Sequence, residues 1–395
     1  MLLVVVVAVA SAVNPLGFQQ PALRGVAVRR VSSRRQVAAA AQPVAAAAAA
    51  TAVVEEKPEK AKVAKLLVFL SLWYAFNGAF NVQNKIILNE FPFPWAVSWV
   101  QLASGLLFVL PAWLTKVRTP PSVDAGLLLR FAPIAALHCI GHGLQVSSMG
   151  AGSVFFTHVI KATEPLIGMV VVFLFTGTIA PWWVNICLAP IIGGVAFAAL
   201  KPGLDLSDLW CFASLAAFAS TVAFAIAKLL AKQLMSKPMK KAHNLDAANN
   251  YGVLTCCSSA LLFLPSMLGE GPGALKALSE MDDPSALGRH LFFCGLLYYG
   301  YNEMGFRCLD LLSPVSAAVA NSLKRVVVLL AAVAFLGETV SSNKILGSSV
   351  AMFGVFLYSV AKARASRLRI LGEKVPEAVP HRNYNATSPA GTWQP

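Results

Sequence analysis

Three basic residues lie within apolar stretches that are long enough to cross a membrane. Lys161 belongs to the segment FFTHVIKATEPL, and Lys324 and Arg325 are adjacent in NSLKRVVV. A charge at the bilayer centre costs at least about 2.5–3.5 kcal/mol, so such side chains usually face a cavity or a partner. Arginine presents a planar fork of donors that matches phosphate oxygens, and lysine adds point charge. Three cations of this kind predict a receptor for a dianion.

Each of these cations also has a simpler interpretation. Lys161 could pair with Glu164, which is spaced i,i+3 and would lie on the same helix face. Lys324 and Arg325 have no acidic residue within four positions, so their alternative is to extend toward the membrane interface. They lie deep within the apolar segment, so their side chains would have to extend far to reach the interface. We therefore favour the anion site. Lys85, near the end of another apolar segment, is the better candidate for an interfacial position.

Other polar side chains in these segments could contact a substrate. His142 in CIGHGLQ and Tyr301 in YYGYNE could donate hydrogen bonds to an organic phosphate, and His158 lies in the same segment as the first cation. Taken alone, each is equally well explained as an interior polar residue whose hydrogen bonds are satisfied. Glu303 and Arg307 are spaced i,i+4 and are expected to pair. If Glu303 turned toward the cations instead, it would lower the charge of the site.

The composition indicates a polytopic membrane protein. The chain has 395 residues, of which 57% are hydrophobic and 13% charged, whereas a soluble domain carries about 25% charged residues. Apolar runs of about 20 residues, the length that spans the hydrocarbon core, recur along most of the chain. The formal charge of +14 does not indicate nucleic-acid binding, because the basic residues lie between apolar spans and in the N-terminal extension. The seven cysteines lack the spacing of a metal site, and we expect no metal and no cofactor.

The apolar runs predict an all-α membrane protein with ten transmembrane helices. They cover residues 66–88, 94–115, 127–148, 152–175, 180–200, 209–231, 251–268, 290–309, 314–336 and 344–362. The connections alternate in charge: those on one side, side A, carry lysines and arginines, and those on side B carry most of the acidic residues. An even number of spans with both termini on the positive side satisfies this alternation.

The two halves of the chain resemble each other. THVIKATEPLIGMVVVFLFTG in the fourth span is similar to ANSLKRVVVLLAAVAFLGE in the ninth, each with a lysine in its first half and a glycine at its exit. Each half contains an odd number of spans, so the two five-helix repeats must be inverted in the membrane. Inverted repeats are frequent in transporters, whose substrate site lies near the midplane between them. We therefore expect the three cations to converge at one depth.

The two ends of the chain are expected to lie outside the helical core. Residues 1–12 resemble a signal peptide, and the Arg-, Ser- and Ala-rich stretch that follows has the composition of a transit peptide. A two-part presequence over residues 1–62 predicts a complex plastid, bounded by more than two membranes; the alternative is a low-complexity tail. We divide the rest into a first repeat (63–200), a second repeat (201–370) and a disordered tail (371–395).

Together these motifs resemble the plastid phosphate translocator family of the drug/metabolite transporter superfamily. LWYAFNGAFNVQNKIILNEFPFPWAVSWVQL is similar to the first two helices of that family, FFTHVIKATEP to its fourth and NSLKR to its ninth. The resemblance implies counter-exchange of inorganic phosphate against phosphorylated three-, five- or six-carbon compounds or phosphoenolpyruvate. By position, the family's phosphate-gripping cations fall on Lys161, Lys324 and Arg325, and its substrate-contacting His and Tyr fall on His142 and Tyr301.

Three positions depart from the family pattern and concern the choice of substrate. Glu303 stands where a glutamine is usual, Lys228 lies near a common Arg-Asn pair, and Gln145 replaces a small hydroxyl residue. A histidine at position 142 is similar to the triose-, pentose- and hexose-phosphate branches. The phosphoenolpyruvate branch tends to have asparagine there.

The sequence therefore predicts a plastid-envelope antiporter that exchanges inorganic phosphate for phosphorylated three-carbon compounds by alternating access. Pentose- or hexose-phosphate exchange, phosphoenolpyruvate exchange and nucleotide-sugar transport in the secretory pathway stay open as alternatives. His158, Glu164 and Glu303 are candidates for supporting roles around the site. We do not expect an enzyme, because no Ser/His/Asp, HExxH or phosphate-loop pattern is present.

Overall fold

A computed structural model describes residues 60–200, 209–235, 237–312, 314–338 and 340–370. The expected tail (371–395), nearly all of the expected presequence and the first residues of the second repeat lie outside these ranges. By its internal contacts the chain divides into two units, Met1–Leu67 and Val68–Pro395. Apart from the first residues of α3, all the helices given below belong to the second unit.

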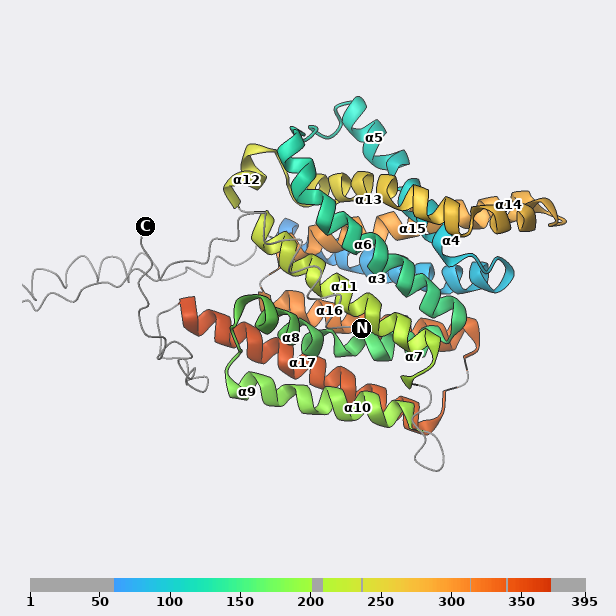
Figure 1. Cartoon of the computed structure of the whole chain (residues 1–395). Coiled ribbons are helices and arrows are strands. Elements are labelled where there is room, and N and C mark those ends of the chain that lie inside the picture. Colours follow the sequence, from blue (N-terminus) through green and yellow to red (C-terminus); the bar gives the residue numbers. More distant parts are fainter. Residues whose placement is uncertain (1–59, 201–208, 236, 313, 339, 371–395) are drawn as a thin grey trace, which may run out of the picture. The chain divides into compact units, whose positions relative to one another are not determined.

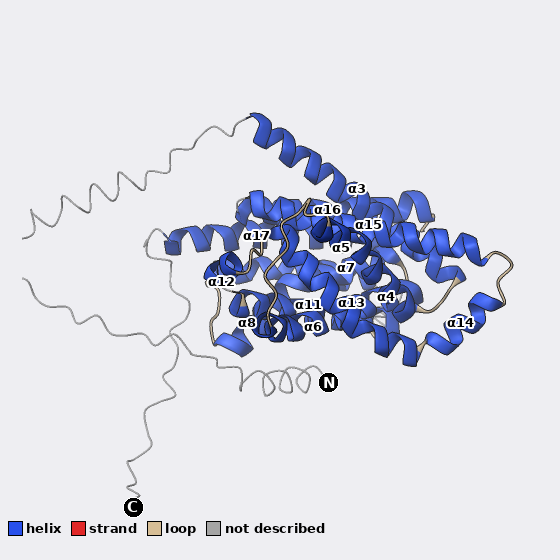
Figure 2. Cartoon of the chain, turned by 90° about the horizontal axis from the view of Figure 1, so that it is seen from above, coloured by secondary structure: helices blue, strands red, loops and turns tan. Residues whose placement is uncertain are grey.

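The described part of the chain is helical, and Figure 2 shows no strand within it. The all-α expectation is confirmed for these residues. The helices are α3 (Lys60–Glu90), α4 (Pro94–Ser104), α5 (Leu106–Leu114), α6 (Ala125–Ala151), α7 (Val154–Ile160), η2 (Lys161–Thr163), α8 (Glu164–Thr176), α9 (Trp182–Asn185), η3 (Ile186–Leu188), α10 (Ala189–Ala199), α11 (Phe212–Leu234), α12 (Lys237–Ala242), α13 (Ala247–Gly269), α14 (Gly271–Ser279), α15 (Pro284–Leu311), α16 (Pro314–Leu336) and α17 (Ser342–Ile370).

Nine helical segments among the described residues are long and apolar enough to cross a membrane. They correspond to nine of the ten expected spans. The tenth, over residues 290–309, lies within α15, which has 28 residues but carries Glu303 and Arg307 in its second half and is too polar to meet the same criterion. The chain is thus a helical multi-pass membrane protein, and the count of ten spans stays a prediction.

The long helices of the second unit run between two ends, which Figure 1 shows on the right at α14 and on the left at α12 and α9. We call these the α14 end and the α12 end. Helix α6 packs against α11, α10 against α17, and α4 against α13 and α15, while α16 packs against both α7 and α17. Helices from the two halves of the sequence therefore lie side by side throughout.

The contact between α10 and α17 depends on two glycines. A Cβ atom on Gly347 would lie 2.4 Å from the backbone nitrogen of Ala198, and one on Gly194 would lie 2.5 Å from that of Ala351. Such distances are shorter than van der Waals contact, so the two backbones can approach this closely only where side chains are absent. Small residues serve this purpose at many helix contacts in membranes.

The fourth span is interrupted where it carries Lys161. Helix α7 gives way to the 3₁₀ turn η2, in which the backbone N–H of Glu164 donates to the carbonyl of Lys161. The next residue is Pro165, which has no N–H to continue the α-helical ladder to that carbonyl. The sequence Lys-Ala-Thr-Glu-Pro thus sets a local change of helix geometry at the buried lysine, a feature that often marks a functional hinge.

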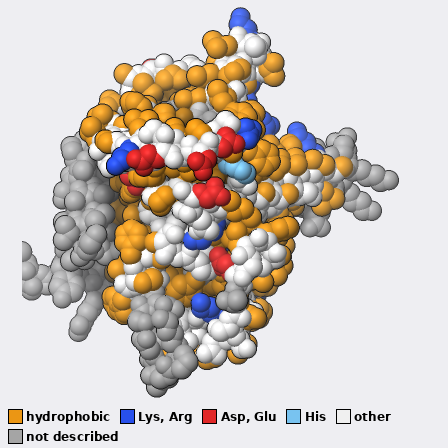
Figure 3. Space-filling model, turned by 90° about the vertical axis from the view of Figure 1, so that its right-hand side faces the viewer, with side chains coloured by type: hydrophobic (Ala, Val, Ile, Leu, Met, Phe, Trp, Pro, Cys, Tyr) orange, Lys and Arg blue, Asp and Glu red, His pale blue; other side chains and the backbone are white. Residues whose placement is uncertain are grey.

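The α14 end exposes several acidic side chains. Figure 3 faces this end and shows them on one region of the surface; Glu90, Glu280, Asp282 and Asp283 are exposed. Glu270 is half-buried, and burial raises the pKa of its carboxyl, while hydrogen bonds from the backbone N–H groups of Ala96 and Trp95 oppose this shift. These described acidic residues thus lie together at the α14 end.

Candidate functional site

The cations singled out in the sequence line one cavity of about 320 Å³ in the second unit. Lys161 comes from η2, whereas Lys324 and Arg325 come from the middle of α16. Two more charged residues line the same cavity, Glu164 at the start of α8 and Lys228 on α11. The cavity is therefore built from both halves of the chain, and its volume lies within the range typical of small-molecule sites, about 300–1,000 Å³.

Lys161 is buried and is held by neutral acceptors. Its Nζ donates to Oε1 of Gln145 at 2.8 Å and to Oγ of Ser220 at 3.1 Å. It also lies 4.9 Å from the centroid of the Phe224 ring, an arrangement that favours a cation electrostatically. Among the described residues no carboxylate contacts Nζ of Lys161, so the i,i+3 pair with Glu164 is not formed.

Glu164 instead bridges two other cations of the cavity. Its Oε1 accepts a hydrogen bond from Nζ of Lys228, and its Oε2 accepts one from the guanidinium of Arg325. The Lys228 side chain is 66% exposed, whereas that of Arg325 is 12% exposed. The carboxylate thus occupies part of the guanidinium fork of Arg325.

Lys324 lacks any hydrogen-bond or ion-pair partner in the described part of the chain. Its Nζ lies 5.1 Å from the centroid of the Trp73 ring, and the side chain lines the cavity. Four basic residues and one acidic residue line this cavity, which leaves a formal excess of three positive charges if the histidines are counted as neutral. An unpartnered ammonium within such an excess of charge is a strong point of attraction for an anion.

The histidines are arranged differently from the expectation. His142 is 1% exposed and is not among the residues that line the cavity; its Nε2 is hydrogen-bonded to Oε1 of Gln101 at 2.9 Å. His138, one helical turn earlier on α6, lines the cavity and lies 3.2 Å from the hydroxyl of Tyr298. His158 also lines it, with its Nε2 2.9 Å from Oδ1 of Asn81.

Tyr301 lines the cavity, whereas Glu303 does not. Glu303 accepts hydrogen bonds from Arg307 at 2.6 Å, the pair expected from the i,i+4 spacing, and from Arg118 at 2.6 Å. The hydroxyl of Tyr299 is a third donor. With its charge satisfied in this cluster, Glu303 does not reduce the charge of the cationic site.

Four residues that shape the site were not assigned to it from the sequence. His138 and His142 are spaced i,i+4 and therefore lie on the same face of a helix. This spacing is the feature of the sequence that indicates His138 as a further candidate. Lys228 and Gln145 were noticed only as departures from the family pattern. Ser220 gave no signal, because its contact with Lys161 joins residues 59 positions apart.

These features define a class of protein: a helical multi-pass membrane protein with a cationic cavity at the junction of its two halves. Comparison with known proteins places the chain more narrowly. Residues 64–359 match the model of the Triose-phosphate Transporter family, and the chain belongs to this family. It is therefore a plastid phosphate translocator homologue within the drug/metabolite transporter superfamily.

Three relatives of the chain have names that contain different phosphorylated compounds. The chain is 32% identical to the xylulose 5-phosphate/phosphate translocator of Arabidopsis thaliana, over 81% of this chain and 76% of the relative. It is 35% identical to phosphoenolpyruvate/phosphate translocator 1 of Oryza sativa subsp. japonica, over 78% and 74%. It is 31% identical to the triose phosphate/phosphate translocator of Flaveria pringlei, over 75% and 71%. The relatives thus share phosphate and differ in the second substrate.

Proposed function

We propose that this protein is a plastid-envelope antiporter that exchanges inorganic phosphate for phosphorylated three-carbon compounds. One observation carries the proposal: the cavity has a formal excess of three basic over acidic side chains, and Lys324 within it has no hydrogen-bond or ion-pair partner among the described residues. Phosphate is a small dianion with oxygens that suit both an arginine fork and lysine point charges. The family's members named above are all phosphate translocators, which supports the same class of substrate here.

Lys161, Lys324 and Arg325 grip the phosphoryl group in this proposal. Arg325 exchanges its contact with Glu164 for one with the substrate, and Glu164 stays with Lys228. Tyr301 and the histidine at the cavity wall, His138, contact the rest of the substrate. His142 supports the wall from behind, through its contact with Tyr298, whose ring centroid is 4.3 Å away.

The size of the cavity favours a small second substrate. Its volume of about 320 Å³ lies at the low end of the range for small-molecule sites, about 300–1,000 Å³. Triose phosphate and 3-phosphoglycerate suit it better than a nucleotide sugar does. Phosphoenolpyruvate is the second candidate, because the identity of 35% to a phosphoenolpyruvate translocator exceeds the 31% to a triose phosphate translocator.

The excess charge also explains why exchange should be obligatory. Closing the helices around an empty site would confine several like charges in a medium of low dielectric, which is costly. A bound dianion removes most of that repulsion. Only the loaded carrier then changes its accessible side, in a structure of ten spans arranged as two inverted repeats with the site between them.

The exchange itself provides the test. Purified protein in vesicles loaded with phosphate should take up labelled phosphate, and a panel of phosphorylated metabolites should compete in the order triose phosphate and 3-phosphoglycerate before hexose phosphates. Lys324→Gln should reduce exchange at least about tenfold, the effect of removing one buried charged contact. The matched control is Lys276→Gln, which removes a lysine that is 76% exposed on α14.

Two results would contradict the proposal. Uptake into phosphate-free vesicles at a comparable rate would exclude obligatory exchange. Competition by nucleotide sugars but not by phosphate would favour the nucleotide-sugar alternative. The location is tested separately, by fusing residues 1–62 to a fluorescent reporter and observing whether it reaches the plastid or the secretory pathway.

A further inference from the structure

The connection between α6 and α7 at the α14 end is held by two charged side chains from other helices. On one flank, Nζ of Lys85 on α3 donates to the carbonyl oxygens of Met149 at 3.0 Å, Gly150 at 3.2 Å and Gly152 at 2.9 Å. The carbonyls at the end of a helix lack partners within the helix, and a lysine can satisfy them. Lys85 therefore caps the C-terminal end of α6.

On the other flank, Glu338 closes the start of α7. Its Oε1 accepts from the backbone N–H of Val154 at 2.8 Å. Its Oε2 accepts from the N–H of Phe155 at 3.0 Å and from the hydroxyl of Ser153 at 2.6 Å. All three bonds are charge-assisted, and a carboxylate is favoured at the positive end of a helix.

This contact joins the two segments that carry the phosphate-gripping cations. Glu338 follows directly after α16, the helix of Lys324 and Arg325, and α7 leads directly into Lys161. Helix α16 packs against α7, so these segments are already close, and Glu338 fastens them at the α14 end. Any motion that separates the cations toward the α14 end must first break its three hydrogen bonds.

The substrate cavity extends toward the opposite end. Among its lining residues, Met235 follows the last turn of α11, Leu309 lies in the last turn of α15 and Asn250 lies in the first turn of α13. Lys228, which also lines it, has a side chain that is 66% exposed. The cavity thus reaches the surface toward the α12 end, while the contact of Glu338 closes the α14 end.

A second carboxylate at the α14 end is placed differently. Glu270 caps α4 by accepting from the N–H groups of Trp95 at 2.8 Å and Ala96 at 3.0 Å. However, α13 and the span Pro94–Leu114, which contains both α4 and α5, are also joined toward the α12 end, where Nε1 of Trp113 on α5 donates to Oδ1 of Asn249 at 2.9 Å. Because this pair is held at both ends, it is suited to a fixed scaffold and not to a moving gate.

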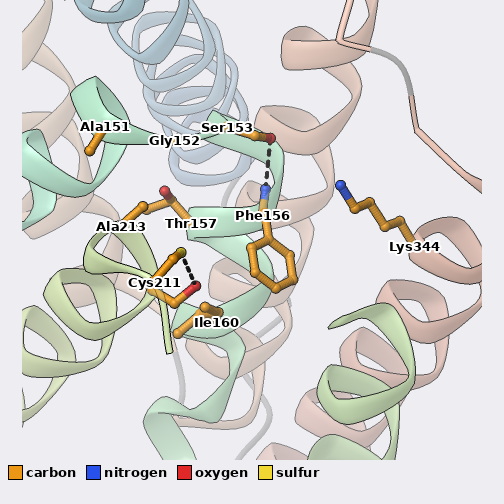
Figure 4. A pocket seen from close by; sticks show the side chains of 10 residues that line it. Ala151, Gly152, Ser153, Phe156, Thr157, Ile160, Cys211, Ala213 and Lys344 are labelled. Carbon is orange, nitrogen blue, oxygen red and sulfur yellow. Dashed lines mark hydrogen bonds between the residues drawn. The ribbon is translucent and has the colours of Figure 1, made fainter. Parts of the chain in front are cut away.

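A hollow beside Glu338's contact gives α7 room to move. It has a volume of about 270 Å³ and is lined by Ser153, Phe156, Thr157 and Ile160 on one side. Figure 4 shows these residues with Lys344 of α17 facing the ring of Phe156, 5.7 Å from its centroid. Ile160 directly precedes Lys161, so a displacement of α7 into this hollow would expose the site to the α14 end.

We propose that Glu338, seated on the start of α7, is the gate of the α14 end. When seated it keeps the cavity accessible only from the α12 end, and its release lets α7 and α16 part so that the site faces the α14 end. The role of this gate in transport rests on the proposed exchange function. The gate itself is a property of the conformations and can be measured without transport.

Two single-cysteine reporters on a background without the seven native cysteines test the gate. Thr157→Cys reports the α14 end, where Thr157 is 3% exposed, and Leu309→Cys reports the α12 end, where Leu309 is 41% exposed. Glu338→Gln weakens all three charge-assisted bonds. We expect a membrane-impermeant maleimide to label Thr157→Cys about tenfold faster in this variant, and Leu309→Cys more slowly.

The control is Glu280→Gln, which removes a carboxylate that is 66% exposed at the same end and should leave both labelling rates unchanged. If Glu338→Gln does not yield a monodisperse protein, Glu338→Asp keeps the charge but is too short to reach all three donors, and should shift the rates in the same direction by less. Unchanged rates in a folded variant would overturn the gate, and so would faster labelling of both reporters, which signals loosening without alternation. Altered labelling without any phosphate exchange would support the gate and contradict the proposed function.

Discussion

At the scale of single residues, the proposed exchange makes Glu164 a competitor of the substrate for Arg325. It accepts hydrogen bonds from Arg325 and Lys228, so phosphate must take over the contact with Arg325. Lys228 offers Glu164 a second partner, which makes this exchange less costly. Because the Lys228 side chain is 66% exposed, its ion pair is worth little more than a typical surface pair.

This competition predicts opposite effects for two substitutions. Lys228→Gln should raise the KM for phosphate about two- to fivefold, because Glu164 then stays on Arg325. Glu164→Gln should lower the KM, and the double variant should restore a value near that of Glu164→Gln alone. Initial rates of phosphate exchange over a range of concentrations measure all three. Additive effects of the two substitutions would show that Lys228 contacts the substrate directly.

The histidines show the limit of prediction at this scale. His142 and His138 lie one turn apart on α6, and residue type alone does not distinguish them. Their positions in the fold decide which histidine lines the cavity. Gln101 and Tyr298 contact His142, whereas His138 lies at the cavity wall. Lys161, in contrast, was recognisable from the sequence, because a lysine in an apolar span needs a special environment.

At the scale of helices, some features follow from the local sequence and others from packing against distant helices. The break at η2 follows from Pro165, which removes one backbone donor. The close approach of α10 and α17 follows from glycines whose role depends on a partner about 150 residues away. Gly194 and Gly347 permit such an approach, but the sequence does not identify the partner helix of either one.

A pair of glycine substitutions tests that contact. Gly347→Ala should destabilise the protein by about 1–3 kcal/mol, because a Cβ would overlap the backbone of α10. Gly193→Ala is the matched control, since a Cβ at Gly193 meets nothing within 4 Å. Thermal unfolding in detergent can be measured as the loss of monodisperse protein. The midpoint temperature of this loss should be lower only for Gly347→Ala. Equal midpoints would mean that α10 and α17 can separate without cost.

At the scale of the whole molecule, phosphate should stabilise the fold even where no transport is measured. A ligand that binds only the native state at one hundred times its dissociation constant adds about 2.7 kcal/mol. Saturating phosphate should therefore raise the unfolding midpoint of the detergent-solubilised protein by about 5 °C. Equimolar chloride should not, and Lys324→Gln should lose most of the rise. A rise of the same size in that variant would place the phosphate site elsewhere.

The sequence by itself determined the class of this protein and most of its spans. Apolar length and charge content are sums over neighbouring residues, so they can be read without knowledge of the fold, and so can the presence of basic residues within apolar spans. Only the tertiary structure decided which side chains meet. It joined Glu164 to Arg325, Gln145 to Lys161 and Glu338 to the start of α7. Those partners lie on different helices, and their meeting depends on packing that no local pattern encodes.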